Sequence, residues 1–290
     1  MEQLRLWWKI ARPKTLPAAL APTICGSALA WSQGEFSVIV LCLALLTSLC
    51  LQIGANFAND YFDFRKGTDR KEDRQGPERV LTTGLVTESQ MLWATVGILA
   101  LAVICGSYLI YLGGFYFIWL ALACLLGAVL YTAGPFALAY NGWADFAVFI
   151  FFGLIAVDGT FYLHTSSLTK EAIAASCGIG ALVVNILVVN NVRDRNTDQI
   201  SHRKTLPVRF GKNFGLWEYK IMLFIAYAAV IFLAFTWRPV LLALLTLPLG
   251  IKLYRDLKNL EGSVLNKTLG LTGKLVLIYA LLVSLGSILG

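Results

Sequence analysis

Long apolar segments separated by short polar breaks follow one another along almost the whole chain. Several approach or reach the ~20 residues that an α-helix needs to cross about 30 Å of hydrocarbon. The pattern predicts nine helices, near residues 16–34, 37–57, 89–111, 114–132, 143–164, 171–190, 215–236, 238–254 and 270–289. We therefore expect an all-α integral membrane protein whose 290 residues form a single domain.

The composition agrees with many spans and excludes a peripheral or single-span protein. Hydrophobic residues make up 58% of the chain, charged residues make up 14%, and the mean hydropathy is +0.70. A soluble domain carries about 25% charged residues, so this chain has too few polar side chains to cover a water-facing surface. The six cysteines lie in apolar segments without paired spacing. We interpret them as small buried side chains rather than as metal ligands or disulfides.

The basic residues are distributed unevenly between the two ends of the predicted helices. With nine spans, all but Lys170 and Arg238 of the 24 Lys and Arg fall on the side of the N-terminus and of two long loops, 58–88 and 191–214. The positive-inside rule places that side in the cytoplasm and the C-terminus across the cell membrane. Topology thus explains the net charge of +7, and no nucleic acid partner is expected. Function is expected at the cytoplasmic face, because loops carry most chemistry.

Polar side chains recur every four residues where the first long loop begins. On a continuing helix, Asn59 and Asp63 would lie one turn apart on one face, where their oxygens can hold a cation between them. Asn56 and Asp60 form a second pair with the same spacing, displaced around the helix. We rank the second pair below the first as a candidate metal site.

The second long loop begins with a similar pattern, because Asn190, Asp194 and Asp198 are also spaced by four residues. Carboxylates on one helix face repel each other, and at a membrane boundary they are costly unless a metal ion or a cationic side chain compensates them. Oxygen ligands without His or Cys are those that Mg²⁺ or Mn²⁺ prefers. The two motifs together therefore predict a divalent-metal site.

Basic residues follow both acidic motifs. They include Arg65, Lys66, Arg70, Lys71, Arg79, Arg193, Arg203, Lys204 and Arg209. Carboxylates that hold metal beside cations that hold phosphate are typical of a diphosphate site. Any single one of these cations is equally explained as a solvated charge that obeys the positive-inside rule. A faint similarity between the two loops predicts that the second and sixth helices face each other across a central cavity.

The UbiA superfamily of intramembrane aromatic prenyltransferases carries two aspartate-rich signatures, which NDYFD at 59–63 and DRNTD at 194–198 resemble. Further segments resemble the branch of the family that prenylates 1,4-dihydroxy-2-naphthoate in menaquinone biosynthesis. These segments are residues 11–17, 131–135, 159–162, 190–194, 204–206 and 265–269. The resemblance covers nearly the whole chain. At one position the chain departs from it, because Gly67 stands where many members carry a third aspartate, and the next acid is Asp69.

The resemblance implies a fold and a reaction. The fold would be a UbiA-type bundle of nine transmembrane helices, with a cytoplasmic cap from the loops after helices 2 and 6 and a lateral opening to membrane lipid for a long isoprenoid tail. The substrates would be a polyprenyl diphosphate and 1,4-dihydroxy-2-naphthoate, which loses its carboxyl group as it is prenylated. The cofactor would be Mg²⁺, for which Mn²⁺ could substitute.

The residues expected to carry this reaction fall into four groups. The catalytic residues would be Asp63, Asp194, Asp198 and Lys204. The metal ligands would be Asn59, Asp60, Asp63, Asp69, Asp194 and Asp198. The diphosphate would be bound by Arg12, Arg65, Lys66, Arg203 and Lys204. The acceptor and the prenyl chain would lie against Asn56, Tyr61, Tyr131, Tyr140 and Asn190.

Two other functions fit parts of the pattern. A prenyltransferase that acts on 4-hydroxybenzoate, homogentisate or haem would carry the same metal motifs, because these motifs recognise the donor that all such enzymes share. A secondary transporter could bind coupling cations with its aspartates, but transporters hold such groups near the membrane midplane in broken helices. Here the acids lie at helix ends and continue into charged loops, which argues against a translocation path.

Overall fold

The computed structural model describes residues 2–67, 75 and 80–290, and this part of the chain is all-helical. The α-helices are α1 (Glu2–Ile10), α2 (Pro17–Ser32), α3 (Val38–Arg65), α4 (Glu88–Gly113), α5 (Phe115–Leu130), α6 (Leu138–Asn141), α7 (Ala144–Val148), α8 (Gly159–Thr165), α9 (Lys170–Arg193), α10 (Arg195–Ile200), α11 (Leu206–Phe210), α12 (Lys212–Leu233), α13 (Leu247–Asn259) and α14 (Leu265–Leu289). A π-helical segment, Phe149–Asp158, joins α7 to α8. Short 3₁₀ segments span Pro13–Thr15, Arg238–Thr246 and Gly262–Val264.

Each of the nine apolar segments predicted from the sequence is helical. In the described part of the chain, six helical stretches are long and apolar enough to cross a membrane: α3, α4, Ala144–Thr165, α9, α12 and Gly262–Leu289. α5 is a shorter apolar helix. The chain is therefore a multi-pass membrane protein, as the hydrophobic pattern predicts.

Two helix ends differ from the prediction in ways that shape the site. α3 continues past residue 57 to Arg65, so the first acidic motif is helical, and Asn59 and Asp63 lie one turn apart. α9 ends at Arg193, and Asp194 joins it to α10 with φ −92° and ψ 5°. The backbone N–H groups of Asp194 and Asp198 still donate to the carbonyls of Asn190 and Asp194, so the three members of the second acidic motif keep their four-residue spacing across this junction.

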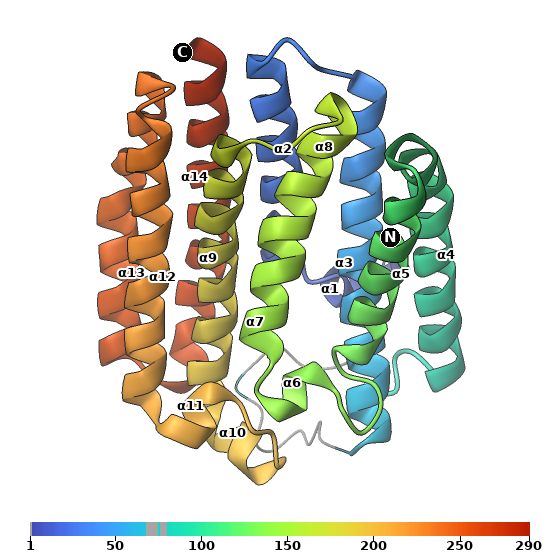
Figure 1. Cartoon of the computed structure of the whole chain (residues 1–290). Helices are drawn as coiled ribbons and strands as arrows, with labels where there is room; N and C mark the ends of the chain where they lie inside the picture. The colour runs from blue at the N-terminus through green and yellow to red at the C-terminus, as the bar shows by residue number, and fades with distance from the viewer. Residues whose placement is uncertain (1, 68–74, 76–79) are drawn as a thin grey trace.

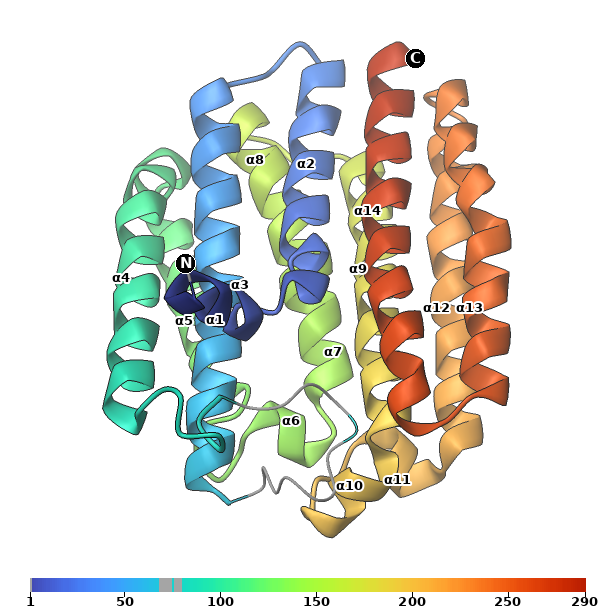
Figure 2. The ribbon, with the colours of Figure 1, turned by 180° about the vertical axis from the view of Figure 1, so that it is seen from behind.

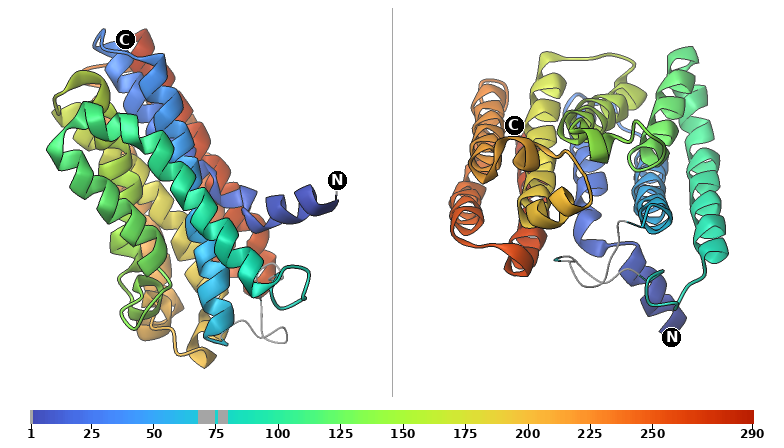
Figure 3. Two further views of the ribbon diagram at one scale, coloured as in Figure 1. Left: turned by 90° about the vertical axis from the view of Figure 1, so that its right-hand side faces the viewer. Right: turned by 90° about the horizontal axis from the view of Figure 1, so that it is seen from below.

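The long helices stand side by side, and the short helices α6, α10 and α11 lie together at one end of the bundle (Figures 1 and 2). We call this end the loop end. Both α3 and α9, which carry the acidic motifs, finish there, whereas the C-terminus lies at the opposite end (Figure 1). α1 leaves the bundle sideways, with the N-terminus pointing away from it (Figure 3).

The tightest packing surrounds α9. Of its most apolar stretch 78% is buried, against 17% for α4. Glycines allow this close approach: a Cβ on Gly180 would lie 2.8 Å from Gly153 Cα, and one on Gly178 would lie 2.7 Å from the Tyr279 hydroxyl. That hydroxyl donates a 2.7 Å hydrogen bond to the Ala226 carbonyl of α12. α9 is thus fixed between the π-helical segment, α12 and α14, and it carries the second acidic motif on a rigid support.

α4 and α5 have the opposite character. α5 has no fully buried residue, and large side chains of both helices are mostly exposed, including Trp93 (69%), Tyr111 (80%) and Tyr116 (81%). Apolar and aromatic side chains on the outside of a bundle are suited to lipid contact. All six cysteines are free, but only Cys25 and Cys50 are buried. Cys42 is exposed and the other three are half-buried, which corrects the expectation of six buried side chains.

α1 packs along the side of α3. The rings of Trp7 and Phe57 lie 5.5 Å apart between centroids, and Ile10 is buried, whereas Leu4 and Trp8 are exposed. This contact fixes where the following 3₁₀ turn begins, and therefore where Arg12 lies.

Candidate active site

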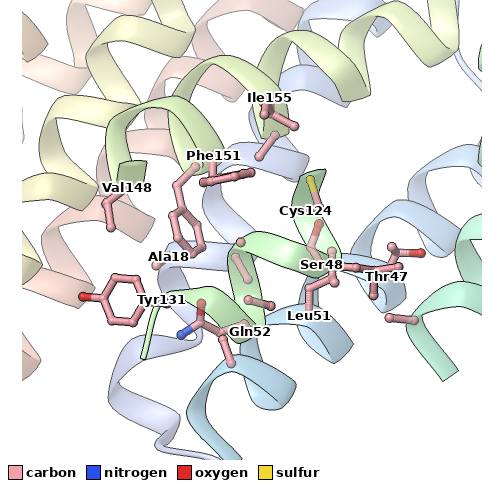
Figure 4. Close-up of a pocket in the computed structure, with 18 of the residues that line it drawn as sticks. Ala18, Thr47, Ser48, Leu51, Gln52, Cys124, Tyr131, Val148, Phe151 and Ile155 are labelled. Carbon is pink, nitrogen blue, oxygen red and sulfur yellow. The ribbon is translucent and has the colours of Figure 1, made fainter. Parts of the chain in front are cut away.

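A cavity of about 390 Å³ lies within the bundle, between α2, α3, α4, α5, α9 and the run from α7 to α8. Its wall is mainly apolar, and Figure 4 shows side chains from α3, α5 and the π-helical segment around it, among them Leu51, Cys124 and Phe151. Polar residues line it towards the loop end, and they are Arg12, Gln52, Asn56, Asn59, Tyr131 and Asn190. A long apolar cavity with polar groups at one end fits a ligand with an apolar tail and a polar head.

Arg12 is held at the cavity by the first acidic motif. Its guanidinium forms an ion pair with the buried carboxylate of Asp60. Asn56 donates hydrogen bonds to the Ala11 carbonyl (3.0 Å) and the Thr15 hydroxyl (3.3 Å). These bonds attach α3 to the residues on both sides of the turn that contains Arg12. Arg12 has a left-handed backbone with φ 53°, which a residue other than glycine adopts at a cost. These contacts offset that cost and direct a cationic side chain to the cavity.

A second arginine joins the two acidic motifs. Nη2 of Arg203 lies 2.7 Å from Oδ2 of Asp63 on α3, and Nε lies 3.9 Å from Oδ1 of Asp198 on α10. The Tyr140 hydroxyl donates a 2.8 Å hydrogen bond to Oδ1 of Asp63, and the Arg203 guanidinium lies 4.6 Å from the Tyr140 ring centroid. Asp63 is fully buried, so its charge depends on this arginine and this phenol.

Lys66 also lies close to the ring of Tyr140. Its ammonium donates hydrogen bonds to the carbonyls of Thr132 (2.6 Å) and Gly134 (3.2 Å) and lies 4.1 Å from the Tyr140 ring centroid. Both cations thus lie within about 5 Å of the Tyr140 ring, whose π-system attracts positive charge. The structure therefore brings Lys66 and Arg203 together at the loop end.

A third arginine neutralises the end of α9. Arg193 donates from Nε to Oδ1 of Asp194 (2.8 Å), from Nη2 to the Asn190 side chain (2.8 Å) and from Nη1 to Oδ1 of Asn266 (2.8 Å). Asn266 in turn donates a 2.9 Å hydrogen bond to the Gln75 carbonyl in the loop after α3. The start of α14 therefore connects the two loops that carry the acidic motifs.

Burial and charge shift the pKa values of the groups in the loops. Burial raises the pKa of Asp198 to about 7, and the charges of Asp194 and Asp63 add to this effect, while Arg203 opposes it. Burial alone would lower the pKa of Arg203, but Asp63, Tyr140 and Asp198 raise it above the usual arginine value. Burial lowers the pKa of Lys66. The loop end therefore combines a carboxyl group that binds protons readily with a guanidinium that stays charged.

The donor chemistry of this cluster fits a hard divalent cation. The side chains that converge supply carboxylate and amide oxygens, which Mg²⁺ prefers. Within residues 2–67, 75 and 80–290, no three His, Cys, Asp or Glu side chains are grouped closely enough to hold a metal ion. Arg203 instead lies between Asp63 and Asp198, where its guanidinium supplies the compensating positive charge. Carboxylates from α3 and α10 thus already flank one cationic group.

The structure brings most, but not all, of the predicted site residues together. Arg65 points away and pairs with Glu88 at 3.3 Å. Tyr61 is buried in the hydrophobic cluster beside α1, with Ile10 and Phe57, and does not line the cavity. Lys204 has an exposed side chain, and its backbone N–H donates to the Tyr140 carbonyl at 2.9 Å. Asp69, and with it Arg70, Lys71 and Arg79, lies outside the described residues.

Sequence reasoning missed two residues of this region. Gln52 lines the cavity and donates a 3.3 Å hydrogen bond to the Thr15 hydroxyl, and its signal is that it interrupts an apolar run. Asn266 supports Arg193, and it lies in segment 265–269, which carries part of the family resemblance. Both are neutral amides, which charge patterns do not reveal.

Comparison with known proteins identifies the family of the chain. Residues 19–269 match the sequence profile of the UbiA prenyltransferase family. The chain belongs to this family. It is 38% identical over 242 residues to 1,4-dihydroxy-2-naphthoate octaprenyltransferase of Haemophilus influenzae, covering 81% of this chain and 78% of the relative. It is 36% identical over 288 residues to the enzyme of the same name from Mycobacterium tuberculosis, covering 98% and 97%.

The fold is that of the UbiA family as well. A UbiA homologue from Archaeoglobus fulgidus, solved bound to DMAPP and Mg²⁺, superposes with a TM-score of 0.61 and covers 96% of this chain and 99% of that one. The two sequences are only 16% identical, so the likeness concerns the fold alone.

Proposed function

We propose that this protein transfers a polyprenyl group from polyprenyl diphosphate to 1,4-dihydroxy-2-naphthoate, with loss of carbon dioxide, to give demethylmenaquinol in menaquinone biosynthesis. The observation that carries the proposal is an apolar cavity whose loop end is lined by Arg12 and adjoins the cluster of Asp63, Asp198 and Arg203. The choice of acceptor is supported by relatives that are named for this reaction and match the chain over most of its length.

The diphosphate head would lie at the loop end. Arg12, Lys66 and Arg203 would donate hydrogen bonds to its oxygens, because they come from the turn after α1, the end of α3 and the loop after α10 and all lie beside the first acidic motif or Tyr140. Mg²⁺, when bound, would neutralise charge on the leaving diphosphate. It would be held by Asn59 and Asp63 from one motif and by Asp194 and Asp198 from the other, with Asp60 and Asp69 as further candidates. Mn²⁺ offers the same preference for oxygen.

The isoprenoid tail would follow the apolar part of the cavity. Residues from Asn59 to Ala44 of α3 line it, and at 1.5 Å per residue this stretch is about 22 Å long. Such a length accommodates an extended prenyl chain, and the sparsely packed wall of α5 faces lipid beyond it. The allylic carbon would then lie near the boundary between polar and apolar lining, where the carbon–oxygen bond breaks and the carbon–carbon bond to the ring forms.

The aromatic acceptor would lie beside Tyr131, Asn56 and Asn190, which line the cavity at that boundary. The face of the Tyr131 ring can stabilise the positive charge on the allylic group, and the two amides can bind the hydroxyl groups of the acceptor. Tyr140 would act through Asp63, to which it is hydrogen-bonded, and Tyr61 would act only by packing. The exposed side chain of Lys204 would reach the diphosphate only after a change of rotamer.

We further propose that the nine helical segments are nine spans of a single domain in the cell membrane, with the loop end in the cytoplasm. The basic charge of the segments that end there supports this orientation. The loops after α3 and α9 would then form a cytoplasmic cap over the site. The water-soluble acceptor and the diphosphate head group of the donor could both reach the site from that side.

The test is an assay of the purified protein in detergent with a polyprenyl diphosphate, Mg²⁺ and either 1,4-dihydroxy-2-naphthoate or 4-hydroxybenzoate. We expect a prenylated product without its carboxyl group from the naphthoate alone, detected by mass spectrometry and abolished by EDTA. Asp63→Asn should lose turnover, whereas the control Glu88→Gln, an exposed acid at the same end, should keep it.

Each other result has a distinct meaning. A product from 4-hydroxybenzoate alone would keep the mechanism and replace the acceptor. Full turnover in Asp63→Asn would remove that residue from the site. No product with either acceptor from folded protein would overturn the proposed reaction and favour a transporter that uses the same acids.

A further inference from the structure

Three lysines on the outer surface of the bundle belong neither to the cavity nor to the acidic motifs. Lys14 lies in the 3₁₀ turn after α1, and Lys267 and Lys274 lie on α14. All three side chains are exposed, and none of them lines the cavity. Within the part of the chain that the structure describes, none forms a hydrogen bond or an ion pair. Their charges are therefore available to a partner from outside the chain.

The packing of the turn on α14 brings the three lysines together. Gly270 lies between the two lysines of α14, three residues after Lys267 and four before Lys274, so the three positions lie within about 60° of one another around the helix. A Cβ on Gly270 would lie 3.5 Å from Cδ and 3.9 Å from Cε of Lys14. The Lys14 side chain therefore lies across α14, at a height between Lys267 and Lys274.

Helix geometry sets how far apart the three side chains begin. Cβ atoms three or four residues apart on a helix are about 5–6 Å from each other. The Cβ atoms of Lys267 and Lys274 are thus each about 5–6 Å from the Cβ position of Gly270, which Lys14 touches. A lysine ammonium stands on a flexible stem of four carbons. The three ammonium groups can therefore converge on one anion.

Close backbone contacts fix the turn in this place. A Cβ on Gly273 would lie 2.7 Å from the Lys14 carbonyl oxygen and 3.8 Å from Cγ of Pro17, so only glycine allows the turn to pack this tightly. α2, which follows the turn, packs along α14 (Figure 2). The lysine cluster is therefore built on a rigid contact between the two ends of the chain.

The depth of Lys274 distinguishes it from an ordinary surface lysine. It lies inside Gly262–Leu289, a stretch long and apolar enough to cross a membrane. About 30 Å of hydrocarbon corresponds to ~20 helical residues, and counted back from Leu289 these reach to about residue 270. Lys274 would therefore stand about 6 Å inside the hydrocarbon, with Lys14 and Lys267 at head-group level. An exposed charge at this depth is costly unless the ammonium reaches the head groups and finds a partner there.

The surface next to the lysines is apolar. Ile278, Leu281 and Leu285 lie within about 40° of Lys274 around α14, further from the loop end, and are 44%, 46% and 46% exposed. One face of α14 thus presents cations at the loop end and an apolar strip beyond them. This arrangement matches a phospholipid, whose phosphate lies at the membrane surface and whose acyl chains extend into the hydrocarbon.

We propose that Lys14, Lys267 and Lys274 bind the phosphate of one anionic phospholipid, with its acyl chains along the apolar strip of α14. An anionic lipid fits better than a zwitterionic one, because the cation of a zwitterionic head group would be repelled by the three lysines. The cytoplasmic leaflet, in which we place the loop end, attracts basic residues through its anionic lipids. The proposal requires only a multi-pass membrane protein and does not depend on the reaction proposed above.

The bound lipid would support the turn that directs Arg12 to the cavity. Lys14 stands two residues after Arg12, and the Thr15 hydroxyl of the same turn accepts hydrogen bonds from Asn56 (3.3 Å) and Gln52 (3.3 Å) of α3. The lipid would thus hold the turn from the side of α14, opposite the contacts with α3.

The experiment measures lipid binding to the purified full-length protein in detergent by native mass spectrometry. Phosphatidylglycerol and phosphatidylcholine with identical acyl chains are added in equal amounts, and the ratio of bound lipids gives the preference. We expect the wild type to retain one phosphatidylglycerol. Each lysine at an anionic membrane surface contributes about fivefold to binding, so Lys274→Gln should lower the preference about fivefold. Lys14→Gln/Lys267→Gln/Lys274→Gln should lower it about a hundredfold.

The matched control is Lys220→Gln/Lys252→Gln/Lys258→Gln, which removes three other exposed lysines, on α12 and α13, and should leave the preference unchanged. An equal loss in both triple variants would overturn the proposal, because net charge alone would then explain the preference. Equal binding of the two lipids by the wild type would overturn it as well. Glycerol phosphate, which lacks acyl chains, should not displace the lipid at equal concentration. Full displacement would show that the cluster binds a soluble anion instead.

Discussion

Replacement of Arg203 is the sharpest test of how the two acidic motifs are held together. Arg203→Gln keeps most of the side-chain volume but removes the guanidinium that lies 2.7 Å from Asp63 and 3.9 Å from Asp198. Asp63 is fully buried, so water cannot replace the lost partner. We expect Arg203→Gln to destabilise the fold in the metal-free state.

The size of the effect follows from the geometry. Two unit charges 4 Å apart interact by about 4 kcal/mol at an effective dielectric constant of ~20. Removal of one partner from a buried ion pair costs about 3–5 kcal/mol. Both figures give an energy of the same order of magnitude. The Arg203 side chain is 19% exposed, so water weakens the pair and the lower end of the range, about 3 kcal/mol, is expected.

The assay is a double-mutant cycle in mixed micelles, with unfolding by increasing SDS in the presence of EDTA. Asp63→Asn removes the charge that Arg203 compensates, so Arg203→Gln should cost far less in that background. We expect a coupling free energy of about 2–3 kcal/mol. A coupling below about 0.5 kcal/mol, the usual limit of additivity, would refute the view that Arg203 stabilises Asp63.

Three further predictions follow from the cavity and its supports. Gly106→Leu adds a side chain that projects into the cavity, where a Cβ would meet Thr47 at 3.4 Å, and should lower kcat/KM for long-chain donors more than for geranyl diphosphate. The control is Gly97→Leu on the same helix, where a Cβ meets nothing within 4 Å, and equal effects of both variants would contradict the prediction. Arg12→Gly should be more stable than Arg12→Ala by about 1 kcal/mol, because glycine adopts φ 53° freely. Unfolding in SDS measures this difference. An equal loss of unfolding free energy in both variants would show that the turn is unstrained. Asn266→Ala removes a 2.8 Å hydrogen bond to the buried Arg193 and should cost about 2 kcal/mol in the same assay, whereas no loss would mean that Asn266 does not support α9.

The helical fold was predictable because the membrane leaves one simple signal. Apolar runs long enough to cross hydrocarbon need no tertiary information to be recognised, since backbone hydrogen bonds in lipid must be satisfied within the helix. The first acidic motif was predictable for the same reason, because four-residue spacing has meaning only on a helix, and α3 does continue through Asp63. The polar lining of the cavity by Asn56, Asn190 and Tyr131 agrees with the family resemblance.

The pairing of charges was not predictable, because it depends on contacts between distant segments. Arg12 and Asp60 are 48 residues apart in sequence, and spacing within either segment says nothing about the other. The end of α9 at Arg193 was not predicted, because the four-residue spacing continues through Asp194 into α10. Arg65 and Lys66 are adjacent in sequence, yet only Lys66 lies beside Tyr140 and Arg203, since one helical step of about 100° separates their directions.

The three arginines explain how a protein can bury so many acids beside a membrane. Asp60 and Asp63 pair with guanidinium groups from distant segments, and Asp194 pairs with that of its neighbour Arg193, so the acids are compensated before any substrate arrives. A guanidinium is displaced from a buried carboxylate only if both receive a new partner, because a buried charge left unpaired would be costly. A divalent ion for the carboxylate and a phosphate for the arginine satisfy this condition together. In the proposed reaction, metal and diphosphate should therefore bind to this cluster as a unit, with Arg203 as the group that changes partners.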